Sequence, residues 1–129
     1  TICGSDIRCI YREHVGKGPE GYIPGMVAGH EPCGVIVEEG EGLRRFKKGD
    51  RVAPYPLLSC GECFACANGI PHVCDTLKLI GIDVDGGIAE FICCDEDVLF
   101  KLDDGITDKA AAVIEPLAVI IRTMHQADF

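Results

Sequence analysis

Four closely spaced cysteines constrain this sequence more than any other feature. Cys60, Cys63, Cys66 and Cys74 follow the pattern C-x2-C-x2-C-x7-C, in a segment with little hydrophobic periodicity. Four thiolates can complete a tetrahedral shell around zinc, and two-residue gaps form tight turns that bring neighbouring sulfurs to one ion. A closed shell leaves no position for a substrate. The pattern therefore predicts a structural zinc that stabilises a lobe with no core of its own.

Three other interpretations of the four cysteines are disulfides, an iron–sulfur cluster and chance clustering of buried thiols. Disulfides are disfavoured because the first residues have neither the basic start nor the apolar run of a secretion signal. The bacterial cluster pattern ends in a three-residue gap followed by proline, whereas the last gap here is longer. His72 lies inside that last gap, and we interpret it as a surface histidine because four thiolates already fill the shell.

Composition narrows the classes of partner. The chain has 129 residues, of which 47% are hydrophobic, and this predicts one globular domain. Its net charge of -9 repels phosphate backbones and anionic lipid surfaces, so we expect no nucleic acid and no membrane partner. No stretch reaches the roughly 18 apolar residues of a membrane span. We expect a cytoplasmic protein.

The hydrophobic pattern predicts a mainly β chain followed by a helix. Thr107 is the expected N-cap of a helix that runs to Gln126, and Pro116 is expected to kink or split it. Short strands that follow closely on one another suggest a barrel or a sandwich. We expect a short helix or turn over residues 2–14, a loop over 16–25 and a turn over 40–42. Strands are expected over 32–39, 88–94 and 98–101, and a turn that leads into another short strand over 46–53.

Several further motifs occur in a fixed order along the chain, and together they resemble the zinc-dependent medium-chain alcohol dehydrogenases. The similarity is closest to the branch of polyol, sorbitol and L-threonine dehydrogenases. It implies a mainly β (α+β) fold, a GroES-like β-barrel catalytic domain with a four-cysteine zinc lobe and a C-terminal helix. The motifs are CGSD at residues 3–6, Gly29-His30-Glu31 with Gly34 and Gly40, GDRV at 49–52, GGIAE at 86–90 and EPLAV at 115–119.

The sequence departs from the family pattern in two ways. Leu43 stands where the family signature has a smaller or β-branched residue, which should affect packing and not chemistry. The family also places residues before the first motif and a dinucleotide-binding domain after EPL. The resemblance therefore implies that residues 1–129 are a GroES-like zinc-binding catalytic domain, truncated at both ends, with the nucleotide-binding domain absent.

The resemblance also implies a second, catalytic zinc, and hence two zinc ions per chain. Cys3 and His30 match the first two ligands of this ion, and Glu31 and Glu115 are alternative third ligands, with the ion exchanging one for the other. Ser5 matches the residue that accepts the substrate proton, and Asp6 anchors the backbone or the ligands. NAD or NADP would be held mainly by the missing domain.

Taken singly, these residues have plainer interpretations. Cys3 could be a buried thiol, His30 a core histidine and Glu115 a surface charge, and the order of the motifs is what favours metal ligands. Residues 16–21 match G-x-G-x-x-G, but no strand precedes them and no helix begins within them, so they receive no cofactor role. Residues 15–22 and Tyr55 are expected near the substrate cleft. The remaining cysteines are interpreted as structural thiols: Cys9, Cys33, Cys93 and Cys94.

The activity implied is that of an NAD(P)-dependent alcohol or polyol dehydrogenase, which oxidises a secondary alcohol to a ketone. The fragment alone is expected to be inactive. Its partner would be a small-molecule alcohol or polyol, and the full-length form would be a homodimer or homotetramer. One alternative is a non-enzymatic, zinc-stabilised binding module that holds a single zinc. Another is an L-threonine dehydrogenase or a reductase of the same family.

Overall fold

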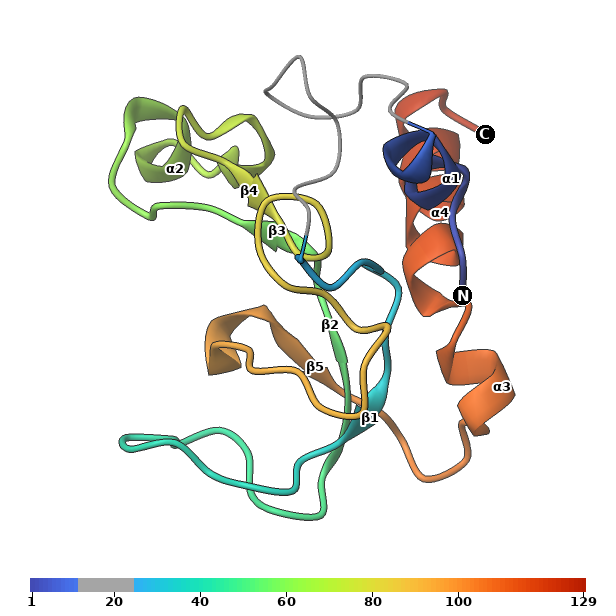
Figure 1. Cartoon of the computed structure of the whole chain (residues 1–129). Helices are drawn as coiled ribbons and strands as arrows, with labels where there is room; N and C mark the ends of the chain where they lie inside the picture. The colour runs from blue at the N-terminus through green and yellow to red at the C-terminus, as the bar shows by residue number, and fades with distance from the viewer. Residues whose placement is uncertain (12–24) are drawn as a thin grey trace. The chain divides into compact units, whose positions relative to one another are not determined.

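The computed structural model describes residues 1–11 and 25–129, which form two compact units (Figure 1). Unit 1 contains Thr1, residues 31–55 and residues 94–129. Unit 2 contains residues 2–30 and 56–93, of which 12–24 are outside the described part. Each unit has its own small sheet, and each is described by itself.

Unit 1 is built on a three-stranded antiparallel sheet with the order β1-β2-β5. The central strand pairs on both sides, and Val52 faces Gly34 in one neighbour and Lys101 in the other. Ala53 of this strand, Leu102 and Ala111 form the core of the unit. The strands are β1 (Gly34–Val35), β2 (Arg51–Pro54) and β5 (Leu99–Lys101), the last preceded by the 3-10 helix η2 (Glu96–Val98).

A buried aspartate holds the turn that leads into β2. Asp50 Oδ2 accepts a hydrogen bond from the Lys47 amide at 3.1 Å, and Oδ1 accepts one from Lys101 Nζ at 2.8 Å. The bond from the Lys101 side chain lowers the pKa of Asp50. The ionised carboxylate thus joins the turn to β5 across the sheet.

Two helices, α3 (Asp108–Ala111) and α4 (Ile114–Gln126), complete unit 1. Thr107 Oγ1 accepts a hydrogen bond from the Ala110 amide at 3.2 Å, which confirms its prediction as an N-cap. The predicted split is also confirmed, but it lies before Pro116. That proline occupies the first turn of α4. Amides in the first turn of a helix have no acceptor within the helix, so proline, which lacks an amide hydrogen, breaks no helical hydrogen bond there.

Unit 2 contains a two-stranded antiparallel sheet, β3 (Leu57–Leu58) with β4 (Lys78–Leu79). Its N-terminal helix α1 (Gly4–Ile10) lies within the range predicted for a short helix or turn. Between the two strands, the cysteine segment forms a short helix, α2 (Phe64–Ala67), and a 3-10 turn, η1 (Pro71–Val73). Ala65, Cys74 and Ile80 are among the buried apolar side chains of this unit.

One predicted strand is wrong, and another is shorter than expected. Residues 88–94 form no strand, because the pairing of Ile88 with residue 28 is not continued, and Ile88 and Phe91 are both exposed. Without a buried face or a continuous partner, a β-branched sequence alone does not form a strand. The strand predicted over residues 32–39 forms only at Gly34–Val35, whereas those near 46–53 and 98–101 are confirmed as β2 and β5. The loop predicted over residues 16–25 lies almost wholly outside the described residues.

Candidate metal centres

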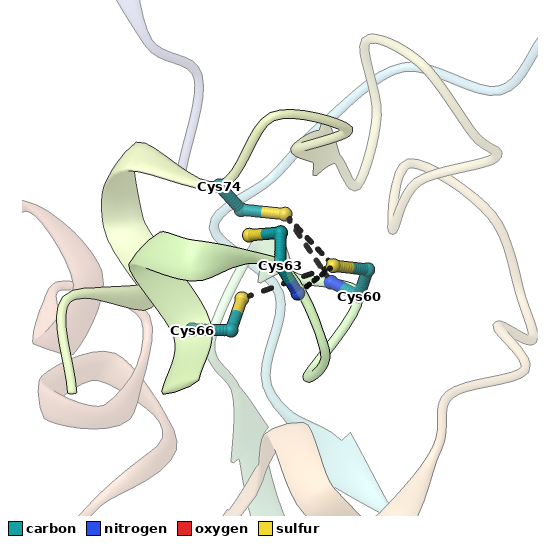
Figure 2. Close-up of side chains that lie close together, drawn as sticks. All are labelled: Cys60, Cys63, Cys66 and Cys74. Carbon is teal, nitrogen blue, oxygen red and sulfur yellow. Dashed lines mark hydrogen bonds between the residues drawn. The ribbon is translucent and has the colours of Figure 1, made fainter. Parts of the chain in front are cut away.

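The four cysteines of unit 2 converge, as predicted from their spacing. Cys60 and Cys63 precede α2, Cys66 lies within it, and Cys74 follows η1. Figure 2 shows the four sulfurs turned toward one another, and all four lie within 4.8 Å of each other. The short helix and the 3-10 turn thus bring together thiols that are up to 14 positions apart.

The sulfur separations fit a tetrahedral zinc site. A Zn–S bond of about 2.3 Å gives an edge of about 3.8 Å between two sulfurs of a regular tetrahedron. Cys60 Sγ lies 3.5 Å from Cys74 Sγ and 4.0 Å from Cys66 Sγ, on either side of that value. These separations are far longer than the roughly 2.05 Å of a disulfide, and the described cysteines form none.

Backbone amides stabilise negative charge in this cluster. The Cys60 amide donates to Cys74 Sγ at 3.3 Å, and the Cys63 amide donates to Cys60 Sγ at 3.3 Å. The bond from the Cys60 backbone lowers the pKa of Cys74 to about 6, whereas burial raises the pKa of Cys66 to about 11. A backbone hydrogen bond from Cys66 also lowers the pKa of Cys63, and thiolates are the form in which cysteines bind a cation.

A second group of candidate ligands lies in unit 2 around His30. The ligand atoms of Cys3 and His30 are within 4.8 Å of one another, although the residues are far apart in sequence. Helix α1 begins next to Cys3, and the Cys3 amide donates to Asp6 Oδ2 at 2.8 Å. Ser5 Oγ lies 3.5 Å from His30 Nε2. The first turn of α1 therefore gathers the predicted residues against a single imidazole ring.

Asp6 is the charged partner of His30. Asp6 Oδ1 lies 3.4 Å from His30 Nδ1, and the two side chains are 2% and 8% exposed. The distance allows an ion pair, but the geometry is not that of a hydrogen bond, so both atoms are buried without a hydrogen-bond partner. A carboxylate beside Nδ1 favours the proton on that nitrogen and leaves the Nε2 lone pair free for a metal. One thiolate and one imidazole are ligand types that zinc prefers, so these residues fit the ion.

The two candidate glutamates belong to unit 1. Glu31 follows His30 directly in the chain, and its side chain is buried, with Oε2 at 3.7 Å from the Thr1 amino nitrogen. Glu115 is half-buried in the first turn of α4. Burial of a carboxylate such as that of Glu31 is costly unless a cation balances it. The Thr1 amino group is one such cation, and a metal ion at this position would be another.

The other predicted residues are placed as follows. His72 is exposed in η1, as expected for a surface histidine. Cys33 packs against the core of unit 1, and its Sγ lies 4.0 Å from the Asp108 carbonyl oxygen, which agrees with a structural thiol. Cys93 is exposed and Cys94 is half-buried, and the side chain of Cys9 is outside the described part. Tyr55 is 44% exposed, whereas residues 15–22 and the glycine motif at 16–21 lie outside the described residues.

Sequence reasoning missed the segment that fastens the backbone next to His30. Asp85 Oδ1 accepts a hydrogen bond from the Val27 amide at 2.9 Å, across 58 positions of sequence. Gly81 and Gly86 lie against the backbone of Gly29. Neither contact has a local sequence signal, and the GGIAE motif to which the glycine pair at 86–87 belongs says nothing of residues 27–29.

Comparison with known proteins places the fold and the family. The sequence-family model of the alcohol dehydrogenase GroES-like domain matches residues 1–104 of this chain. Starvation-sensing protein RspB of Escherichia coli K12 is 41% identical over 118 residues, which cover 92% of this chain and 33% of that protein. L-threonine 3-dehydrogenase of Idiomarina loihiensis is 35% identical over 123 residues, which cover 95% of this chain and 36% of that protein. The chain thus spans about a third of these relatives.

Solved structures agree with the sequence comparison. Galactitol-1-phosphate dehydrogenase of Escherichia coli aligns with a TM-score of 0.88 at 32% identity, over 98% of this chain and 35% of that one. The rspB short chain alcohol dehydrogenase of E. coli CFT073, complexed with NADH, aligns with a TM-score of 0.83 at 37% identity. The alignment covers 97% of this chain and 35% of that one. Among the described residues, no helix has the length and apolar character needed to cross a bilayer. The expected GroES-like fold class is confirmed, and the chain belongs to the alcohol dehydrogenase GroES-like domain family.

Proposed function

We propose that residues 1–129 form the zinc-binding catalytic domain of an NAD(P)-dependent alcohol or polyol dehydrogenase that oxidises a secondary alcohol to a ketone. The observation that carries this proposal is the cluster of Cys3, His30, Asp6 and Ser5, buried or half-buried in unit 2. The four-cysteine lobe supports a separate, structural zinc. Family membership and relatives that are dehydrogenases agree with both sites.

In this proposal the thiolate of Cys3 and the Nε2 atom of His30 hold the catalytic ion. Asp6 keeps the His30 proton on Nδ1 and orients the ring, and its other oxygen fixes the backbone of Cys3. Glu31 and Glu115 are the alternative third ligands, and the burial of Glu31 supports its role. Bound zinc would supply Lewis-acid chemistry toward an alcohol oxygen, and a nicotinamide cofactor would supply the hydride acceptor.

Ser5 is proposed to move the substrate proton. Its Oγ lies on the same side of the His30 ring as Nε2, at 3.5 Å, so a hydroxyl next to a metal on that nitrogen would be within reach. The serine oxygen can accept the substrate proton while its own hydroxyl proton is released to solvent, which reaches this half-buried side chain. In the full-length enzyme, a Ser5→Ala variant should therefore lower turnover while both metal sites stay filled.

The proposal extends to a cytoplasmic location and a homodimeric or homotetrameric full-length form with a small-molecule substrate and NAD or NADP. The acidic charge of -9 supports the absence of nucleic acid and anionic membrane partners. The solved relative complexed with NADH supports a nicotinamide cofactor. The mass of the native protein in solution tests the assembly.

Zinc content tests the proposed function most directly. We expect two zinc ions per chain in metal-washed protein, measured by elemental analysis, and one in the Cys3→Ser/His30→Ala double variant. The matched control is Cys33→Ser, which removes a thiol from the core of unit 1 and should leave both ions bound. One zinc in both the wild type and the double variant would contradict the catalytic site. It would favour a non-enzymatic module stabilised by the cysteine lobe alone.

A further inference from the structure

The segment from Val27 to His30 is fastened along its length by one distant loop, residues 81–88, within unit 2. The Gly86 amide donates to the Val27 carbonyl at 2.7 Å, that of Gly87 to Gly29 at 2.8 Å, and that of Ile88 to Ala28 at 2.9 Å. Asp85 Oδ1 accepts from the Val27 amide at 2.9 Å. The residues directly before the candidate ligand His30 therefore take their position from this loop.

Glycines allow the two backbones to approach this closely. Gly81 has φ +76° and Gly29 has φ +95°, conformations that side chains disfavour. A Cβ on Gly81 would lie 2.5 Å from the oxygen and 2.7 Å from the nitrogen of Gly29. A Cβ on Gly86 would collide with the same carbonyl oxygen of Gly29 and with the Cα of Gly81. Backbone atoms cannot rotate away as a flexible side chain can, so any added carbon would have to displace Gly29.

We infer that Gly81 is a positioning residue for His30, and that the loop 81–88 sets the metal affinity of the Cys3–His30 site. Gly29 is bonded directly to His30, and ligand atoms tolerate errors of only about 0.2 Å from ideal metal–ligand distances. His30 must at the same time keep its ring between Asp6 and Ser5. A shift of Gly29 would change the position of the ring relative to Cys3. The inference rests on the proposed function, because it takes the second metal site as given.

The test compares two glycines with the same backbone conformation. Gly69 also has φ +76°, but a Cβ there meets nothing within 4 Å, so Gly69→Ala carries the strain without the collision. The full-length protein is titrated with zinc and with cobalt. In the Gly81→Ala variant, the Cys3–His30 site should bind these ions roughly tenfold to hundredfold more weakly than in the wild type. Its cobalt absorption spectrum should also change. The four-thiolate site should stay filled, and Gly69→Ala should bind both ions as the wild type does.

A milder pair of substitutions covers the case in which Gly81→Ala fails to fold and loses both ions. Asp85→Ala removes the acceptor for the Val27 amide and should weaken only the Cys3–His30 site, whereas Asp85→Asn keeps a side-chain oxygen and should restore its affinity. Wild-type affinity and an unchanged cobalt spectrum in Gly81→Ala, or in Asp85→Ala if Gly81→Ala is unfolded, would overturn the inference. A wild-type protein that binds one ion would instead contradict the proposed function.

Discussion

Glu96 shows how a single half-buried carboxylate can organise backbone in unit 1. Its Oε2 accepts hydrogen bonds from the amides of Arg44 and Arg45, at 3.1 Å and 2.9 Å, across more than 50 positions of sequence. The bond from the Arg45 backbone, followed by that from Arg44, lowers the pKa of Glu96. The ionised carboxylate therefore stabilises the folded turn before Phe46 more than it stabilises the unfolded chain.

The pH dependence of this contribution has a definite sign. Because the folded pKa of Glu96 is lowered, its stabilisation is complete above the ordinary glutamate pKa and is lost as pH falls through the lowered value. We expect Glu96→Gln to reduce the urea midpoint of unit 1 at about pH 7, and the difference from wild type to shrink as pH falls below the ordinary glutamate pKa. The control is Asp97→Asn, whose exposed carboxylate lies 3.5 Å from Arg45 and should matter little at either pH. A Glu96→Gln difference that persists in acid would contradict this account.

At the residue scale, the sequence predicted which candidate ligands lie together better than it predicted the residues that position them. The four thiols were predictable because their spacing is local and zinc fixes what four cysteines can do. Cys3 and His30 were predictable only through the order of family motifs. Asp85 and Gly81 were not predicted, because their contacts with residues 27–29 depend on a loop whose path no periodicity encodes.

At the element scale, helix signals held better than strand signals. Thr107 was recognised as a cap because its hydroxyl satisfies an amide of the same turn, a purely local interaction. The strand expected over residues 88–94 does not form, because strands depend on partners elsewhere in the chain. Ile88 and Phe91 are both exposed, so these apolar side chains have no buried face to pack on. Pro116 was correctly linked to a break, but the break precedes it because proline is compatible with a first helical turn.

The N-cap gives a prediction for the element it begins. Thr107→Ala removes the acceptor for the Ala110 amide and should lower the free energy of unfolding of unit 1 by about 1 kcal/mol. Urea denaturation followed by circular dichroism measures this. Thr107→Ser keeps the oxygen at the same position and should remain close to the wild type. Equal losses in both variants would show that the methyl group, and not the hydrogen bond, stabilises the start of α3.

At the scale of the whole molecule, the two units differ in what holds them together. Unit 1 has a three-stranded sheet and a small apolar core at Ala53, Leu102 and Ala111. The cysteine lobe of unit 2 buries Ala65 and Cys74 but has only short helical turns around them. A lobe with so little buried apolar surface depends on cross-links, and in a protein without disulfides among its described cysteines a metal is the cross-link that the residues can form.

Removal of zinc should therefore unfold part of the protein and spare the rest. We expect a chelator to increase hydrogen exchange of the lobe amides that bond within it, such as those of Ala67 and Ile70, by roughly tenfold or more. The amides of Leu102 and Ala111, which bond within unit 1, should keep their protection. Hydrogen exchange with mass spectrometry measures both regions in one sample, and zinc added back should restore the lobe. A uniform loss across both regions would show that metal binding supports the whole fold, and an unchanged lobe would show that its four thiols need no ion.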